Sequence, residues 1–293
     1  MNTRLAFPDL ETAEQKGEPT FAVAFGGGGA RGVSHIQIIE ALDELGIRPV
    51  AISGSSIGAI MGAGMASGMT GREIRDYTLE TVGHRGTLLN KLWSLGPATM
   101  RDKLGGFRFG HFNLELILDA FLPPQVPKDF EDLEIPMKIS ATDYYGQAEV
   151  ILEKGDLRQA IAASAAIPGL FMPIWVNGRV MIDGGVFNPV PYEQLMELAD
   201  VVIGVDVVGA PEGDGTHPPN RIDSLFGASQ LTMQASISLK LKLNPPQIFL
   251  RPSVNRFRVL DFLRAREILN ESESVKDELK RAIDALHSAA AEG

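Results

Sequence analysis

Short apolar runs alternate with longer amphipathic segments along most of the chain. The runs that have the length and composition of buried strands are 21–25, 49–53, 136–142, 147–152 and 200–208. The segments that repeat apolar residues at helical spacing are 33–45, 57–68, 71–81, 112–122 and 157–166, followed by a mostly helical C-terminal region. Because strands and helices alternate, the pattern predicts an α/β fold with a largely parallel central sheet between helices.

A cluster of glycines follows the first predicted strand. Four glycines from Gly26 to Gly29, and a further one at Gly32, stand between strand 21–25 and helix 33–45. Successive glycines let several backbone N–H groups point into one concavity, and the dipole of the following helix favours negative charge there. The loop is therefore suited to bind a phosphate or to stabilise an oxyanion.

Two interpretations compete for this loop. The pattern Gly27-x-Gly29-x-x-Gly32 also matches the dinucleotide-binding fingerprint, which places its glycines between a strand and a helix. That fingerprint requires an acidic residue about 20 positions further on, at the end of the second strand, to bind the ribose hydroxyls. The second strand, 49–53, contains no carboxylate and runs into a serine-containing turn. The sequence thus favours the oxyanion loop over a nucleotide site.

The turn after the second strand has the pattern of a nucleophile elbow. The pentapeptide Gly54-Ser55-Ser56-Ile57-Gly58 places glycines two positions on either side of Ser56, where Cβ atoms would collide in a sharp strand-to-helix turn. The hydroxyl of Ser56 is then exposed at a helix N-terminus, whereas Ser53 belongs to the strand and Ser55 is off centre. Small residues also gather in ordinary tight turns, so this pattern needs a partner base to indicate chemistry.

The histidines of the chain do not supply a clear base. His217 lies in an acidic, Gly/Pro-rich loop, and His287 lies in a polar C-terminal helix. His35 falls inside the helix after the glycine loop, where a packed side chain is the usual role, and His84 and His111 flank a basic, loop-rich stretch. A base other than histidine is therefore expected.

A carboxylate is the better candidate. Asp183 ends the apolar run 180–182 and precedes two glycines, which let another backbone segment come close. Asp-Gly is also a common hairpin turn, and this is the alternative interpretation. Asp143 and Asp206 lie at or near strand ends as well, where acidic side chains more often satisfy backbone groups or line the rim of a site.

Four motifs in one order make the chain resemble the patatin-like phospholipases, a family of serine acyl hydrolases that uses a Ser–Asp dyad without histidine. The motifs are Gly27-x-Gly29-x-Arg31-Gly32, Gly54-x-Ser56-x-Gly58, Ala163-Ser164-Ala165-Ala166-Ile167-Pro168 with Phe171 and Pro173, and Asp183-Gly184-Gly185. Gln37 stands where many bacterial members have a further glycine. The resemblance covers about residues 20 to 208 and implies a three-layer α/β/α fold.

The resemblance also implies roles for individual residues. It makes Ser56 the nucleophile and Asp183 the base, and it implies neither a metal nor a cofactor. Arg31 either holds the glycine loop, meets a lipid phosphate or is an ordinary surface arginine. The main-chain N–H groups assigned to the oxyanion hole are those of Gly27, Gly28 and Gly29. The residues that support the motifs are Arg31, Gly32, Gly54, Gly58, Gly184 and Gly185.

The implied function is hydrolysis of carboxylic esters in phospholipids, lysophospholipids or related acyl lipids through an acyl-serine intermediate. Acyl transfer to an alcohol is an alternative that uses the same dyad, and a regulatory or adaptor protein of low turnover is another. On this interpretation residues 1–20 form a flexible tail and 21–209 form the catalytic domain. Residues 210–293 then form a mostly helical extension that packs on the same domain.

Composition limits the kinds of partner and the cellular compartment that are expected. The chain has 293 residues and a net charge of −10, which argues against nucleic acid as a partner. It contains no cysteine, which excludes disulfides and thiol-ligated metals and fits a cytoplasmic protein. The first twenty residues lack the apolar core of a signal peptide, so a cytoplasmic location is expected.

Positive charge is concentrated in two stretches. Residues 84–111 mix lysine and arginine with leucine, tryptophan and phenylalanine. Such a segment is suited to rest on anionic lipid at the inner face of a membrane and to act as a lid, or it is a linker with solvated arginines. The second stretch, 240–266, is a candidate oligomer interface, and the sequence leaves the oligomeric state open.

Overall fold

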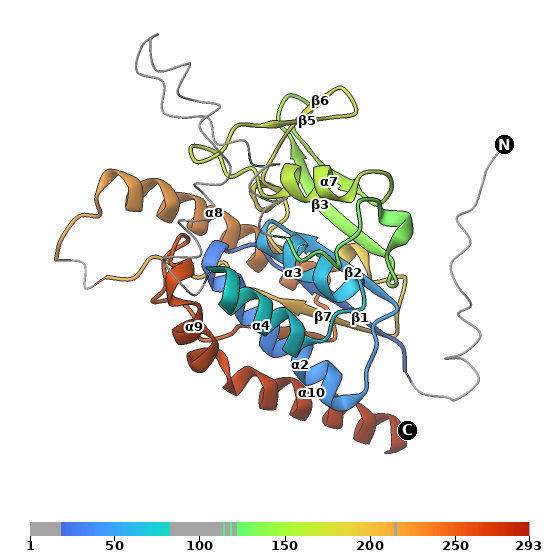
Figure 1. The fold of residues 1–293 in the computed structure, drawn as a ribbon. Helices are drawn as coiled ribbons and strands as arrows, with labels where there is room; N and C mark the ends of the chain where they lie inside the picture. The colour runs from blue at the N-terminus through green and yellow to red at the C-terminus, as the bar shows by residue number, and fades with distance from the viewer. Residues whose placement is uncertain (1–18, 83–113, 115–117, 119–121, 214–215, 293) are drawn as a thin grey trace, which may run out of the picture.

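The computed structural model describes residues 19–82, 114, 118, 122–213 and 216–292 (Figure 1). The strands are β1 Phe21–Phe25, β2 Ala51–Ser55, β3 Met137–Asp143, β4 Ala148–Leu152, β5 Ile174–Val176, β6 Arg179–Ile182, β7 Val201–Val205 and β8 Ile248–Leu250. The α-helices are α2 His35–Leu45, α3 Ile57–Ala66, α4 Gly71–Val82, α7 Leu157–Ser164, α8 Arg221–Leu243, α9 Ala265–Ser272 and α10 Ser274–Glu292. Short 3-10 helices are η1 Gly29–Ser34, η3 Phe130–Asp132, η4 Gly184–Val186, η5 Tyr192–Gln194 and η6 Phe262–Arg264.

The described strands form one mixed, eight-stranded sheet. Its order is β5-β6-β3-β2-β1-β7-β8, and β4 pairs with β3 off this path. The pairs β3–β2, β2–β1, β1–β7 and β7–β8 are parallel, whereas β4, β5 and β6 join antiparallel. This arrangement confirms the predicted α/β fold with a largely parallel sheet.

The register of β3 brings two distant segments together. Strand β2 runs along one edge of β3 until Ser55 pairs with Ser140, while β4 occupies the opposite edge. Strand β6 pairs with Thr142 and Asp143 of β3, and β4 pairs with the same two residues. Because β4 occupies one edge of β3, β6 must lie on the other edge, just beyond the end of β2. Because β6 runs antiparallel, its last residue leads directly toward the turn that follows β2. The sheet itself therefore places the segment after residue 182 beside the segment after residue 55.

Helices cover both faces of the sheet. On β1, Phe21, Val23 and Phe25 belong to one apolar core, which also includes residues of α2, α3, α7, α9 and α10. The alternate residues Ala22 and Ala24 belong to a second core, with Ile237 of α8 and residues of the 190–202 segment. In Figure 1, α10 (red) lies along α2, and α8 (orange) lies on the other side of the sheet. The predicted three-layer arrangement is thus confirmed.

Several elements differ from their predicted limits. Strand β2 extends to Ser55, two residues beyond the predicted end, because the parallel pairing with β3 continues through the glycine. The predicted helix 33–45 begins as the 3-10 helix η1 at Gly29, and it ends at Gly46 in the left-handed conformation, as expected. Strands β5 and β8 are only three residues long and were not predicted, and β8 interrupts the helical C-terminal region.

Some predictions fall outside the described residues. They concern the tail up to residue 18, the stretch 84–111 with its proposed lid role, and most of the helix predicted at 112–122, of which Leu114 and Leu118 are described and helical. The predicted domain boundaries stay a prediction. In the described part of the chain, no helix has both the length and the apolar character needed to span a membrane.

Candidate active site

Ser56 occupies a strained turn between β2 and α3. Its backbone angles are φ 54° and ψ −122°, a conformation that residues other than glycine rarely adopt. A Cβ atom at Gly54 would lie 2.7 Å from the backbone of Ala59, and one at Gly58 would collide with the carbonyl oxygen of Phe25. The turn therefore requires glycine on both sides of Ser56, as in a nucleophile elbow.

The hydroxyl of Ser56 contacts the carboxylate of Asp183 directly. Ser56 Oγ donates a hydrogen bond of 2.6 Å to Asp183 Oδ2, and the other carboxylate oxygen accepts one of 2.8 Å from the Gly185 N–H. Both side chains are buried, with 5% and 4% relative exposure. Asp183 leads from β6 into η4, so the register of the sheet explains why two residues 127 positions apart meet.

Burial changes the acidity of Asp183. Loss of hydration raises its pKa from 3.8 to about 6, although the hydrogen bonds from Ser56 and Gly185 act in the opposite direction. The carboxylate is then mostly ionised at neutral pH, yet its pKa lies closer to the working pH than that of an exposed aspartate. A carboxylate with such a pKa is better suited to accept and return a proton.

The glycine loop offers two free N–H donors beside this pair. The N–H groups of Gly26, Gly27 and Ala30 donate to the carbonyls of Val205, Pro189 and Val259. No hydrogen bond joins the N–H of Gly28 or Gly29 to another described residue, and both glycines line the same pocket as Ser56. Of the three predicted oxyanion donors, Gly27 is thus already engaged, while Gly28 and Gly29 are available.

Arg31 holds the glycine loop from behind. Its side chain is 3% exposed, and it donates to the carbonyl oxygens of Val207 and Phe257, each at 3.0 Å. Burial lowers the pKa of the guanidinium to about 10, against the opposing attraction of Asp206 and Asp261, so Arg31 stays protonated at neutral pH. The side chain ties η1 to the end of β7 and to the 257–259 loop. These contacts match the loop-holding role among the three that the sequence left open.

The remaining motif glycines lie where a side chain or a backbone carbonyl comes too close for a Cβ atom. A Cβ atom at Gly32 would collide with the Ile57 side chain, and one at Gly184 would collide with the Ser140 carbonyl. At Gly185 a Cβ atom would lie 2.9 Å from Asp183 Oδ1. These glycines therefore permit the contacts among the glycine loop, the elbow and the turn after Asp183.

The alternative bases lie elsewhere. His35 is fully buried, its Nε2 lies 2.8 Å from the Gly26 carbonyl oxygen, and burial lowers its pKa to about 4. His217 and His287 are exposed, and His84 and His111 lie outside the described residues. Asp143 accepts from the Gly146 N–H, and Asp206 accepts from the Val208 N–H and pairs with Arg251 at 2.9 Å. Neither carboxylate lines the pocket that contains Ser56.

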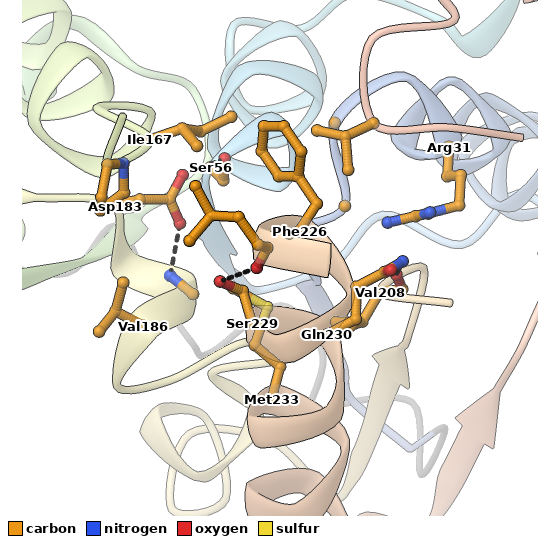
Figure 2. Close-up of a pocket in the computed structure, with 17 residues that line it drawn as sticks. Arg31, Ser56, Ile167, Asp183, Val186, Val208, Phe226, Ser229, Gln230 and Met233 are labelled. Carbon is orange, nitrogen blue, oxygen red and sulfur yellow. Dashed lines mark hydrogen bonds between the residues drawn. The ribbon is translucent and has the colours of Figure 1, made fainter. Parts of the chain in front are cut away.

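The pocket at the Ser–Asp pair is mostly apolar. Figure 2 shows Ser56, Asp183 and Ile167 on one side and Arg31, Val208 and Gln230 on the other, with α8 running below. The apolar lining residues are Ile167, Pro168, Val186, Val208, Leu225, Phe226, Met233 and Val259. Such a lining fits an acyl chain better than a polar substrate. Within the described residues, no group of three or more histidine or acidic side chains gathers into a metal site.

A family model of known sequences matches the segment that carries these residues. Residues 23–196, more than half of the chain, match the model described as patatin-like phospholipase. The chain belongs to the patatin-like phospholipase family. Ser56, Asp183 and the glycine loop all lie within the matched segment, whereas α8 lies outside it.

Individual relatives match the chain over different lengths. An uncharacterised NTE family protein of Mycobacterium tuberculosis is 36% identical over 199 residues, which are 67% of this chain and 51% of that protein. A lysophospholipase NTE1 of Yarrowia lipolytica is 28% identical over 281 residues, covering 84% of this chain and 18% of that protein. The chain thus spans about half the length of the mycobacterial relative and under a fifth of the yeast one.

Two solved structures illustrate the comparison with known folds. VipD from Legionella pneumophila has a TM-score of 0.47 at 16% identity and covers 89% of this chain and 67% of that one. Human GIVD cytosolic phospholipase A2, in complex with methyl gamma-linolenyl fluorophosphonate, has a TM-score of 0.48 at 14% identity. That match covers 91% of this patatin-like chain and 58% of the human one.

Sequence reasoning missed part of the site. Leu225, Phe226 and Met233 of α8 line the pocket, and their only signal is an apolar helix beyond the last motif. Ser164, in the third of the four motifs, contacts the backbone of Ser56 through its hydroxyl. The sequence analysis recognised this motif but predicted no role for its serine.

Proposed function

We propose that this patatin-like chain hydrolyses carboxylic esters of phospholipids, lysophospholipids or related acyl lipids. The observation that carries the proposal is the 2.6 Å hydrogen bond from Ser56 Oγ to the buried carboxylate of Asp183. Beside it lie the N–H groups of Gly28 and Gly29, which donate to no other described residue. A nucleophile, a base and two donors for an oxyanion thus converge in one apolar pocket.

The proposed reaction has two halves. Ser56 Oγ attacks the ester carbonyl while its proton passes to Asp183, and the N–H groups of Gly28 and Gly29 stabilise the oxyanion. Asp183 then returns the proton to the leaving alcohol, which departs and leaves an acyl-Ser56. In the second half Asp183 takes a proton from water, the hydroxide attacks the acyl carbonyl, and the fatty acid leaves as Ser56 regains its proton.

The proposal predicts how the rate depends on pH. Asp183 must be ionised to act as the base, and its pKa is raised to about 6. Activity should therefore fall as the pH drops through about 6, at a higher pH than a solvent-exposed aspartate would give. The other ionisable group among the lining residues is Arg31, which stays protonated across this range.

Peripheral contact with an anionic membrane surface is part of the proposal. Val186 and Leu225 line the pocket with 42% and 58% exposure, and Phe187 and Leu260, next to lining residues in the chain, are 46% and 51% exposed. Apolar side chains at a pocket mouth let an acyl chain pass from lipid to the reacting groups without crossing water. A protein at the inner face of a membrane needs such contact, and sedimentation with anionic vesicles that leaves all protein in the supernatant would contradict it.

Acyl transfer is the second enzymatic possibility. It differs from hydrolysis only in the second half of the reaction, where an alcohol replaces water. Product analysis with and without an acceptor alcohol separates the two: a new ester indicates transfer, and free fatty acid alone indicates hydrolysis. A regulatory protein that uses the fold without turnover would release neither product.

The test is release of fatty acid from lysophosphatidylcholine and phosphatidylcholine in mixed micelles. The wild-type protein is expected to release fatty acid, and Ser56→Ala and Asp183→Ala are expected to lose at least about 10³-fold in rate. Ser55→Ala is the matched control, because Ser55 is an adjacent buried serine whose hydroxyl has no hydrogen-bond partner among the described residues. Equal rates in Ser56→Ala and wild type would refute the proposal.

A further inference from the structure

The segment that ends α7 contacts both members of the Ser–Asp pair. Ser164 is the last residue of α7, and its hydroxyl accepts a hydrogen bond of 2.8 Å from the Ser56 N–H. Two residues later, the carbonyl oxygen of Ala166 accepts a hydrogen bond of 3.0 Å from the Asp183 N–H. One short stretch of chain thus holds the backbone of the proposed nucleophile and that of the proposed base.

The hydroxyl of Ser164 is fully engaged. It is completely buried, and besides accepting from Ser56 it donates a hydrogen bond of 2.6 Å to the carbonyl oxygen of Ser140 on β3. The direction of each bond is fixed, since the Ser56 N–H can only donate and the Ser140 carbonyl can only accept. The hydroxyl therefore links the elbow to the sheet at the residue where β2 ends its pairing with β3.

The helix that carries Ser164 is itself anchored. The side chain of Asp156 caps its N-terminus by accepting from the Gln159 N–H at 2.8 Å, and Ala160, Ile161 and Ala163 are buried in the core. The turn that follows is closed by backbone bonds from Ala165 to Ile161 and from Leu170 to Ile167. A rigid support is what a positioning role requires.

Ser56 needs such support more than most residues. It holds a strained backbone conformation, and its N–H is not used by the helix that follows. In the absence of the Ser164 hydroxyl, this buried N–H would have no acceptor, so the turn would shift to find one. A shift of the turn moves Ser56 Oγ relative to Asp183 Oδ2, whose backbone is held separately by Ala166 and by Thr142 Oγ1 at 2.9 Å.

We propose that Ser164 is a positioning residue that fixes the backbone of Ser56 so that its hydroxyl is aligned with Asp183. The inference rests on the proposed function and extends it to a residue that touches neither the ester nor the oxyanion. It also gives a physical reason for the serine in the motif Ala163-Ser164-Ala165-Ala166-Ile167-Pro168, while Ile167 and Pro168 line the pocket.

The experiment compares Ser164→Ala, Ser164→Thr and Ser164→Val with wild type. Threonine and valine have nearly the same shape, so this pair isolates the hydroxyl even where added volume disturbs the fold. Ser272→Ala is the matched control, because Ser272 is another fully buried helical serine, whose hydroxyl bonds Ile268 O in α9 at 2.7 Å. The readouts are the rate of labelling at Ser56 by an alkyl fluorophosphonate per folded molecule, kcat and KM for a lysophospholipid, and the melting temperature.

The expected result is a loss of about 10- to 100-fold in labelling rate and in kcat for Ser164→Ala and Ser164→Val, with KM little changed, because a small misalignment acts on the chemical step. Ser164→Thr should recover most of the wild-type rate, and Ser272→Ala should retain it. A role in folding alone would lower the melting temperature or the folded fraction and leave the rate per folded molecule unchanged.

The pH profile gives a second readout. The hydrogen bond from Ser56 lowers the pKa of Asp183, so misalignment in Ser164→Ala should move the acidic limb of kcat/KM to higher pH. Charged groups on the elements around Asp183 are bonded to other residues. Arg31 bonds Val207 and Phe257, Asp143 bonds Gly146 and pairs with Arg179, Glu149 bonds Asn188, Lys240 bonds Val190, Arg158 bonds Val126, and Lys138 bonds Gln194. None of these bonds involves Ser164.

Each outcome decides the question. Labelling of wild type at Ser56 together with full rates and an unchanged pH profile in Ser164→Val overturns the positioning role and leaves the proposed function standing. Absence of labelling at Ser56 in wild type overturns the proposed function and the positioning role with it. Equal losses in the valine and threonine variants assign the effect to shape and also overturn the role of the hydroxyl.

Discussion

The proposed reacting groups and the apolar wall of the same pocket are held in place in different ways. Ser56, Asp183 and the glycine loop are fixed by hydrogen bonds and by backbone contacts that leave no room for a Cβ atom. The wall contributed by α8 consists of Leu225, Phe226 and Met233, which need only supply apolar surface. In the first region each position accepts only particular residue types, whereas in the second the positions need only be apolar.

The family model covers the first of these regions and not the second. The matched segment, residues 23–196, contains the proposed reacting groups and ends before α8. Two backbones that approach closely accept only glycine, whereas many residues can form one wall of an acyl pocket. We therefore expect substitutions in the reacting region to change the rate of the chemical step and substitutions in α8 to change the choice of substrate.

Among the variants that test this contrast between the two regions, the largest effect is expected from Gly28→Ala. An added Cβ atom would collide with the carbonyl oxygen of Val207, so the loop must move and its N–H groups would leave their positions beside Ser56. Loss of an oxyanion donor typically lowers the rate by about 10²–10³-fold, and kcat for a soluble ester should fall by that amount. Gly213→Ala is the control, because a Cβ atom there meets nothing within 4 Å. A Gly28→Ala rate within threefold of wild type would remove this loop from the proposed chemistry.

The next effect concerns stability: removing the charge of Asp183 should make the folded protein more stable. The folded protein raises the pKa of Asp183 from 3.8 to about 6, so it binds a proton more tightly than the unfolded chain and is destabilised by ionisation above that range. Asp183→Asn is always neutral, so it should gain up to about 3 kcal/mol in free energy of unfolding at pH 8 and little near pH 4. Urea unfolding at both pH values measures this.

The control for this prediction is Asp284→Asn, because Asp284 is exposed on α10. It should show no gain that grows with pH. If Asp183→Asn is no more stable than wild type at pH 8, burying the ionised carboxylate does not destabilise the fold. That result would weaken the contrast between a constrained reacting region and a permissive wall.

The smallest effect is expected in the wall. Phe226 lies in the pocket near Ser56 (Figure 2), and Phe226→Ala would open space for a longer acyl chain. The ratio of kcat/KM for a long over a short p-nitrophenyl ester should rise by roughly tenfold or less, while the rate of fluorophosphonate labelling stays close to wild type. Leu231→Ala on the same helix is the control, because Leu231 is 60% exposed and does not line the pocket. An equal loss of kcat/KM for all esters would indicate that Phe226 affects the chemical step and not the choice of acyl chain.

The sequence predicted those parts of the molecule that depend on local rules. Alternating strands and helices gave the layered sheet, and Gly46 ended α2 in the left-handed conformation as expected. The contacts between the motif glycines and neighbouring backbone are of the kind that their spacing indicated. Local patterns report on turns and on element type because these depend on residues close together in the chain.

The parts that were missed depend on contacts between distant residues. Strands β5 and β8 are three residues long and are stabilised by pairing with β6 and β7, which no local pattern reveals. The bond from Gly27 N–H to the Pro189 carbonyl, which takes one predicted donor out of use, joins segments 162 positions apart. The role of α8 in the pocket likewise depends on tertiary packing and not on a motif.

The most direct test of the Ser56–Asp183 assignment is peptide mapping after treatment with an alkyl fluorophosphonate in the presence of detergent. We predict one adduct, on Ser56, that persists in Ser55→Ala, is absent from Ser56→Ala and forms much more slowly in Asp183→Ala. An adduct on another residue, or labelling of Ser56 that proceeds at the same rate without the Asp183 carboxylate, would contradict the account.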